Sequence, residues 1–153
     1  MKLFKLFLLF LFINFGALGL GVLLMGTGAT SDWYTSMNQA PWTPPNWAFG
    51  ASWAFIMLCF SLYMASLYVK NPTNKVITLF IIQFILNVTW NFVFFNQHLV
   101  AIALGIIIAL TFIITAFLVT YLKLMKARTL LVMPYFIWIC IATSLNLFIF
   151  INN

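Results

Sequence analysis

Five long apolar runs follow one another along the chain, separated by shorter polar breaks. They cover residues of about 6–25, 48–69, 76–95, 99–122 and 130–151. About 20 apolar residues in a helix span the hydrocarbon core of a bilayer, so each run can cross it once. The pattern predicts an all-α integral membrane protein: a five-transmembrane-helix bundle, one domain over residues 1–153, with a long structured loop between the first two helices.

The first run also has a feature of secretory signal peptides, because Lys2 and Lys5 precede it. Its length exceeds the roughly 7 to 15 residues of a signal's hydrophobic region, so we interpret it as the first transmembrane helix. Only residues 96–98 separate the third run from the fourth. These two helices are therefore expected to be antiparallel neighbours.

Composition excludes most chemistries that a soluble protein could offer. Hydrophobic residues make up 65% of the chain and charged residues 5%. The net charge of +6 is scattered between apolar runs and cannot form the stripe that tracks nucleic-acid phosphates. Asp32 is the only acidic residue, His98 is the only histidine, and Cys59 and Cys140 lie in separate runs. We therefore expect no carboxylate pair, no metal site and no ion-coupling residue, and no cofactor is required.

The basic residues predict the orientation of the chain in the membrane. With five spans, all seven Lys and Arg residues fall on one side, at the N-terminus and in the second and fourth connections. Positive loops are retained in the cytoplasm, which places the N-terminus there and puts the first loop and the C-terminus on the opposite side. We expect a multi-pass protein of a bacterial inner membrane.

The stretch from Trp33 to Trp53 differs from this hydrocarbon background. It contains four of the six tryptophans and three of the five prolines. Pro41, Pro44 and Pro45 fix the backbone φ angle and disfavour helix in the residues before them, so the segment should be stiff. Two interpretations stay open: an aromatic belt at the membrane interface or, as we favour, a lid over a cavity.

Uncharged polar residues interrupt the third and fifth runs. Gln83, Asn87 and Trp90 follow the i, i+4, i+7 spacing of one helical face, which Phe94 extends by a turn. A second such face in the fifth run carries Trp138, Ala142 and Leu145, with Asn146 beside it. These amides either pair with neighbouring helices or line a pocket, because an unpaired amide in hydrocarbon is costly. His98, at the end of the third run, is interpreted as a polar turn residue rather than a haem ligand.

Four motifs carry a resemblance to a known family. They are WY at Trp33–Tyr34, PWxPPxWxFGxxW at Pro41–Trp53, QxxLNxxWxxxFF at Gln83–Phe95 and PYxxWxxxATxLN at Pro134–Asn146. In this order, and over nearly the whole chain, they resemble the tryptophan-rich TspO/MBR family. The resemblance implies a five-helix fold, a homodimer, and a pocket beneath the first loop that binds protoporphyrin IX, haem and drug-like hydrophobic ligands. Carried over to this sequence, the ligand-binding residues would be Trp42, Trp47, Phe49, Gly50, Trp53, Gln83, Asn87, Trp90, Phe94, Trp138, Ala142, Leu145 and Asn146.

The resemblance leaves more than one function open. We favour a receptor or sensor that binds tetrapyrroles, with membrane lipid and a second copy of the chain as further partners. One alternative is light- and oxygen-dependent breakdown of protoporphyrin IX, in which Trp53 and Trp138 would be the redox-active groups. Passive transport of porphyrin or lipid is another. The fifth run lacks the Tyr and Arg of the cholesterol-recognition pattern, so cholesterol binding through that pattern is not predicted.

Overall fold

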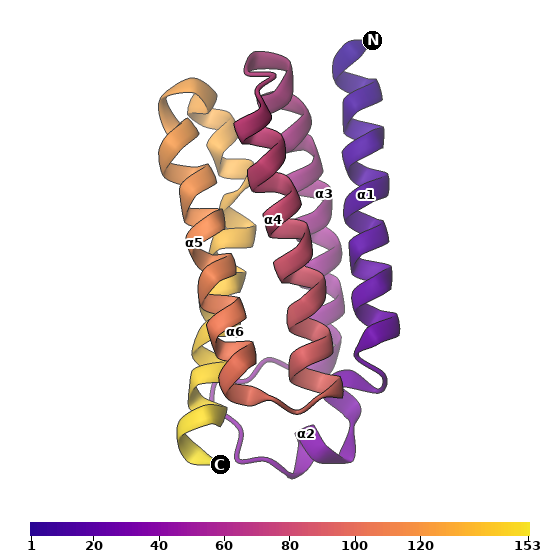
Figure 1. Cartoon of the computed structure of the whole chain (residues 1–153), viewed down its shortest axis with the longest axis vertical. Coiled ribbons are helices and arrows are strands. Elements are labelled where there is room, and N and C mark those ends of the chain that lie inside the picture. The colour runs from indigo at the N-terminus through magenta and orange to yellow at the C-terminus, as the bar shows by residue number, and fades with distance from the viewer.

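The apolar runs form the long helices of a single bundle (Figure 1). The computed structural model describes all residues from Met1 to Asn153. In chain order the elements are α1 (Lys2–Leu24), η1 (Gly28–Thr30), α2 (Asp32–Ser36), α3 (Asn46–Lys70), α4 (Asn74–Asn91), η2 (Phe92–Asn96), α5 (Val100–Met125), η3 (Lys126–Leu131) and α6 (Met133–Asn152). The structure has five helices long and apolar enough to cross a membrane and contains no strand. The predicted five-helix membrane fold is confirmed.

The helix ends differ from the predicted runs by a few residues, each for a local reason. α1 begins at Lys2, because lysine is a good helix former and the hydropathy pattern detects only the apolar part of the helix. α6 begins at Met133 rather than near residue 130. Pro134 occupies its first turn, where a missing backbone N–H breaks no helical hydrogen bond. The residues just before it, Lys126–Leu131, form the 3-10 helix η3.

The third predicted run does not end as a regular α-helix. Its last turn, η2, is a π-helix. The backbone N–H of Gln97 donates to the carbonyl oxygen of Phe92 at 3.0 Å, five residues back along the chain. π-Helical turns are rare, and they occur frequently at functional sites. Here the turn buries two consecutive aromatic residues, Phe94 and Phe95.

Packing differs between the two halves of the bundle. In α3, nine residues from Ile56 onward are buried, whereas none between Asn46 and Phe55 is. The densely packed half contains interlocked aromatic rings. The ring of Phe60 meets those of Phe117 and Tyr135 edge to face, at centroid distances of 5.6 and 5.2 Å. Each such pair contributes about 0.5 to 1.5 kcal/mol beyond the area it buries. The space for a cavity therefore lies in the other half, beside the first turns of α3.

Among the contacts that hold α1 to its neighbours are one hydrogen bond and one close approach. The Nδ2 of Asn14 donates to the Oγ of Ser61 on α3 at 2.8 Å, and both residues are buried. Farther along α1, a Cβ added at Gly21 would lie 2.9 Å from the Nδ2 of Asn91 on α4. Small residues permit such close contact between membrane helices, so Gly21 fixes α1 against the cavity side of α4.

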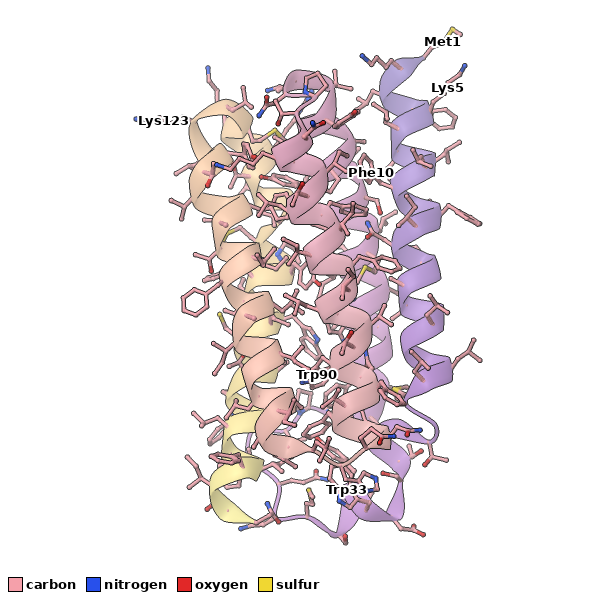
Figure 2. All side chains as sticks on the ribbon, viewed as in Figure 1. Met1, Lys5, Phe10, Trp33, Trp90 and Lys123 are labelled. Carbon is pink, nitrogen blue, oxygen red and sulfur yellow. The ribbon has the colours of Figure 1, made fainter.

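Charge is separated between the two ends of the bundle. Figure 1 places the N-terminus, the α3–α4 connection and η3 at one end, and the first loop, the α4–α5 connection and the C-terminus at the other. Figure 2 shows Met1, Lys5 and Lys123 toward the first end and Trp33 at the second. We call them the basic end and the loop end. A chain that crosses the membrane five times is predicted to have this separation of charge. The side of the membrane that each end faces stays a prediction.

Candidate ligand-binding site beneath the first loop

The first loop crosses the loop end of the bundle and is attached there at three places. At the first, the ring of Trp33 stacks on His98 with a centroid distance of 4.1 Å and an interplanar angle of 12°. It also meets Phe94 edge to face at 5.5 Å. The short helix α2, which carries Trp33, is capped by Ser31, whose Oγ accepts a hydrogen bond from the backbone N–H of Tyr34 at 3.2 Å. This attachment turns Tyr34 inward, where it is buried.

The other two attachments join the loop to the C-terminal part of the chain. The backbone N–H of Asn38 donates to the Oδ1 of Asn153 at 2.8 Å, and the Nδ2 of Asn153 donates back to the carbonyl oxygen of Asn38 at 3.2 Å. The Nε1 of Trp42 donates to the Oγ of Ser144 at 3.1 Å, and its ring packs edge to face on Phe148 at 5.5 Å. The loop thus reaches from α1 across to α6 before it returns to α3 (Figure 1).

Beneath this loop lies a cavity of about 100 Å³ between α1, α3 and α4. We call it the main cavity. Aromatic and aliphatic side chains form most of its wall, together with two amides. The lining residues are Leu18, Val22, Met25, Ala29, Phe49, Gly50, Trp53, Asn87, Trp90, Asn91 and Phe95.

A second cavity, of about 20 Å³, lies between the loop, α4 and α6. We call it the minor cavity. It is lined by Tyr34, Phe49, Trp90, Phe94, Phe95, Ala142, Leu145, Asn146 and Ile149. Phe49, Trp90 and Phe95 line both cavities, so their rings form the partition between them. Phe94 packs against two of these rings: it stacks on Trp90 at 5.4 Å and meets Phe95 edge to face at 4.8 Å.

Two of the amides predicted to line a pocket are paired with neighbouring helices. The Nε2 of Gln83 donates to the hydroxyl of Tyr135 at 2.8 Å, in the densely packed half. The Oδ1 of Asn146 accepts a hydrogen bond from the Nε1 of Trp90 at 3.1 Å, and its Nδ2 donates to the carbonyl oxygen of Val100 at 3.3 Å. Both amides therefore join neighbouring helices, as the packing interpretation predicts, although the Oε1 of Gln83 has no partner and Asn146 also lines the minor cavity.

Asn87 differs from these two amides. Its side chain lines the main cavity and is 3% exposed, yet it makes no hydrogen bond to the protein. The one hydrogen bond at this residue involves its backbone carbonyl oxygen, which accepts from the Nδ2 of Asn91 at 3.0 Å. A buried amide without a partner is costly unless something else satisfies it. The Asn87 amide in the wall of the main cavity is therefore free to bind a ligand.

The tryptophans predicted to form the site are divided between its wall and its surroundings. Trp53 and Trp90 line the main cavity. Trp138 does not: it meets Phe49 edge to face at 5.7 Å, from behind the partition, and lines an outer groove between α3 and α6. Trp42 and Trp47 are 54% and 75% exposed and line neither cavity. Trp42 of the loop and Trp47 of α3 are thus outside the walls of both cavities, whereas the loop contributes Tyr34 to the minor one.

Sequence reasoning did not identify the contribution of the first helix. Leu18, Val22 and Met25 form one wall of the main cavity. In this run the side chains that face a cavity and those that face lipid are both apolar, so the sequence does not distinguish them. Asn91 was detectable, because it lies four residues after Asn87 and extends the same polar face.

The chemistry available in these cavities is limited to stacking and hydrogen bonding. No group of three or more His, Cys, Asp or Glu side chains could hold a metal ion. Tyr34 is the only titratable residue lining either cavity, and burial raises the pKa of its phenol, which stays neutral near pH 7. His98 lies outside both cavities, stacked on Trp33. The site can therefore bind a flat apolar molecule, and it offers no acid or base for proton transfer.

Known proteins are similar to this chain in amino-acid sequence over most of its length. The model of the TspO/MBR family matches residues 7–151. The tryptophan-rich protein TspO of Chlorobaculum tepidum is 29% identical over 120 residues, with 76% of each chain covered. The tryptophan-rich sensory protein of Cereibacter sphaeroides is 28% identical over 75% of this chain and 73% of its own. The human translocator protein is 24% identical over 79% of this chain and 75% of its own. With its five membrane-spanning helices, the chain therefore belongs to the TspO/MBR family of membrane sensory and translocator proteins.

Proposed function

We propose that this protein is a membrane receptor that binds a tetrapyrrole, such as protoporphyrin IX or haem, or a related flat hydrophobic molecule beneath the first loop. The observation that carries the proposal is the unpaired amide of Asn87 in a cavity walled by Trp53, Trp90 and Phe49. Small-molecule sites combine apolar and aromatic walls with a few well-placed polar groups. Indole and phenyl faces would stack on the macrocycle, and Asn87 would bond to a polar atom at its edge.

The size of the main cavity sets a condition on this proposal. Its volume is about 100 Å³. Drug-sized ligands occupy pockets of about 300 to 1,000 Å³, so a tetrapyrrole requires the wall to move. The partition of Phe49, Trp90 and Phe95 is the part of the wall whose displacement would join the main and minor cavities. We therefore expect binding to break the hydrogen bond between Trp90 and Asn146.

The residues present favour recognition of the ring rather than of a bound iron. Neither cavity contains His, Cys or a carboxylate, and the Met25 thioether and the Tyr34 phenol are the only side chains in their walls that could ligate haem iron. The lysines and the arginine gather at the opposite end of the bundle, so the carboxylates of a tetrapyrrole would remain near water at the loop end. Protoporphyrin IX and haem should accordingly bind with similar affinity.

Titration of the purified protein with protoporphyrin IX, followed by quenching of tryptophan fluorescence, tests the proposal. Asn87→Leu removes the free amide at similar volume. It should weaken binding by about 3- to 10-fold, the equivalent of one net hydrogen bond of about 0.5 to 1.5 kcal/mol. Thr115→Val is the matched control, because its hydroxyl bonds to the carbonyl oxygen of Thr111 outside both cavities. Saturable binding that Asn87→Leu leaves unchanged would mean that the ligand lies elsewhere.

A second candidate function, photo-oxidative breakdown of protoporphyrin IX with dioxygen as the oxidant, is favoured by the position of Trp53. Its ring lines the main cavity and meets Tyr135 edge to face at 5.7 Å, so an oxidisable pair would adjoin a bound photosensitiser. Illumination in air should then consume the porphyrin and yield an open-chain product in the wild type, and Trp53→Phe should not. Recovery of intact porphyrin from the illuminated wild type would leave binding alone.

A further inference from the structure

The main cavity is not closed on all sides. Gly50, on the second turn of α3, lines the cavity and is at the same time exposed on the surface of the bundle. A Cβ added at Gly50 would meet no atom within 4 Å. A residue that belongs both to the wall of a cavity and to the outer surface marks an opening, and the missing side chain of Gly50 leaves that opening unobstructed.

The other side of this opening is formed by α1. Val22 also lines the cavity and is 50% exposed, and Leu18 and Met25 beside it are partly exposed. On either side of α1, Asn14 bonds to α3 and Gly21 approaches α4 closely. Val22 of α1 and Gly50 of α3 thus bound the opening of the main cavity, and we call this opening the lateral mouth. It is separate from the groove that Leu6, Phe10 and Ile13 line farther along α1.

The lateral mouth faces the hydrocarbon of the bilayer rather than water. Gly50 lies four residues into α3, or about 6 Å below the start of the helix at a rise of 1.5 Å per residue. The large exposed side chains next to its two edges in the chain are apolar: Leu23, which follows Val22, is 79% exposed, and Trp47, one turn before Gly50, is 75% exposed. Such a surface lies in lipid when the helices span a membrane.

The alternative route, from water through the loop end, is obstructed. The first loop crosses that end and is attached there by the stack of Trp33 on His98, the paired hydrogen bonds of Asn38 with Asn153 and the contact of Trp42 with α6. Passage through the lateral mouth requires none of these contacts to break. The easier path to the Asn87 amide therefore begins in the membrane.

We propose that ligands reach the main cavity sideways from the bilayer, through the lateral mouth between α1 and α3, and that Gly50 keeps this passage open. The proposal deepens the binding function proposed above and rests on it for the identity of the occupant. It also defines the ligand class: molecules that first dissolve in the hydrocarbon, with a thin flat apolar body and a polar group able to meet Asn87. Water-soluble molecules of similar shape are excluded.

Photolabelling tests the passage without reference to any natural ligand. The protein is reconstituted in phosphatidylcholine vesicles with a phenyl diazirine dissolved in the bilayer, irradiated, and mapped by mass spectrometry. We expect adducts on Trp53 and Asn87 in the wild type and their loss in Gly50→Leu. Gly105→Leu is the matched control, because Gly105 is an exposed helical glycine on α5 whose added Cβ also meets nothing within 4 Å. Unchanged internal labelling in Gly50→Leu, equal loss in both variants, or no internal labelling of the wild type would overturn the proposal.

Binding kinetics with vesicle-dissolved protoporphyrin IX distinguish a blocked passage from a filled cavity. A leucine that blocks the mouth should slow association and dissociation severalfold together and leave Kd near the wild-type value, whereas one that fills the cavity should raise Kd through faster dissociation. Asn153→Ala, which loosens the loop, should leave both rates unchanged, and faster association in that variant would favour the water route instead. If the diazirine reaches Asn87 but protoporphyrin IX does not bind, the lateral mouth stands and the tetrapyrrole assignment fails.

Discussion

Gly21→Ala tests the contact that holds α1 against the cavity wall. The new Cβ would lie 2.9 Å from the Nδ2 of Asn91, so that amide must move and lose its 3.0 Å hydrogen bond to the carbonyl oxygen of Asn87. Gly19→Ala is the reference, because a Cβ at Gly19 meets nothing within 4 Å. Both variants gain the same helix propensity, about 1 kcal/mol, so their difference in stability isolates the contact.

The expected difference is about 2 kcal/mol. A lost hydrogen bond accounts for about 0.5 to 1.5 kcal/mol, and displacement of the flexible Asn91 side chain adds about 1 kcal/mol, the low end of the cost of overpacking. Unfolding in mixed detergent micelles, followed by circular dichroism, measures both variants. Asn91→Ala, combined with Gly21→Ala, should restore the part due to overpacking, about 1 kcal/mol, because it removes the clash but also the hydrogen bond. Equal stability of the two glycine variants, or no restoration by Asn91→Ala, would refute the reasoning.

Three further results are expected. Asn153→Ala removes both hydrogen bonds to Asn38 and should speed amide hydrogen exchange in the first loop, while the free energy of unfolding changes by no more than about 1 kcal/mol. A double-mutant cycle between Asn14 and Ser61 should give a coupling of about 0.6 kcal/mol and not above about 1.7 kcal/mol, the range of hydrogen bonds between membrane helices. Burial raises the pKa of Tyr34, so folding favours its neutral form. This stabilisation is complete below the ordinary pKa of about 10 and is lost as pH rises through the pKa of the folded state. In Tyr34→Phe the free energy of unfolding, measured against pH, should therefore fall less steeply at alkaline pH.

The sequence was sufficient to predict the bundle because length and hydropathy determine which segments can cross a membrane. It also brought together much of the cavity wall, since Asn87, Trp90 and Trp53 are conspicuous against an aliphatic background. It could not distinguish Asn87 from Gln83, which occupies the same helical face. The difference depends on Tyr135, which lies on another helix and pairs with Gln83 alone.

The tryptophans of the first loop illustrate a different limit. Trp42 and Trp53 stand in the same motif, yet Trp53 lines the main cavity and Trp42 packs on the outside of α6. A motif gives the order of residues along the chain, whereas the direction of each side chain depends on where the loop is attached. The membrane orientation, the homodimer and the physiological ligand depend on molecules outside the chain and stay predictions.

The π-helical turn η2 determines how the aromatic rings between the two cavities are oriented. An α-helix advances about 100° per residue, so consecutive positions such as Phe94 and Phe95 would normally point in well-separated directions. The wider turn lets both rings remain inside, with Phe95 in the wall of each cavity. Shortening the segment by one residue would rewind it to α-helical pitch and swing one ring outward, without disturbing the aromatic packing near the basic end. A rotation of a single turn is therefore enough to change the shape of the binding site while the rest of the bundle remains in place.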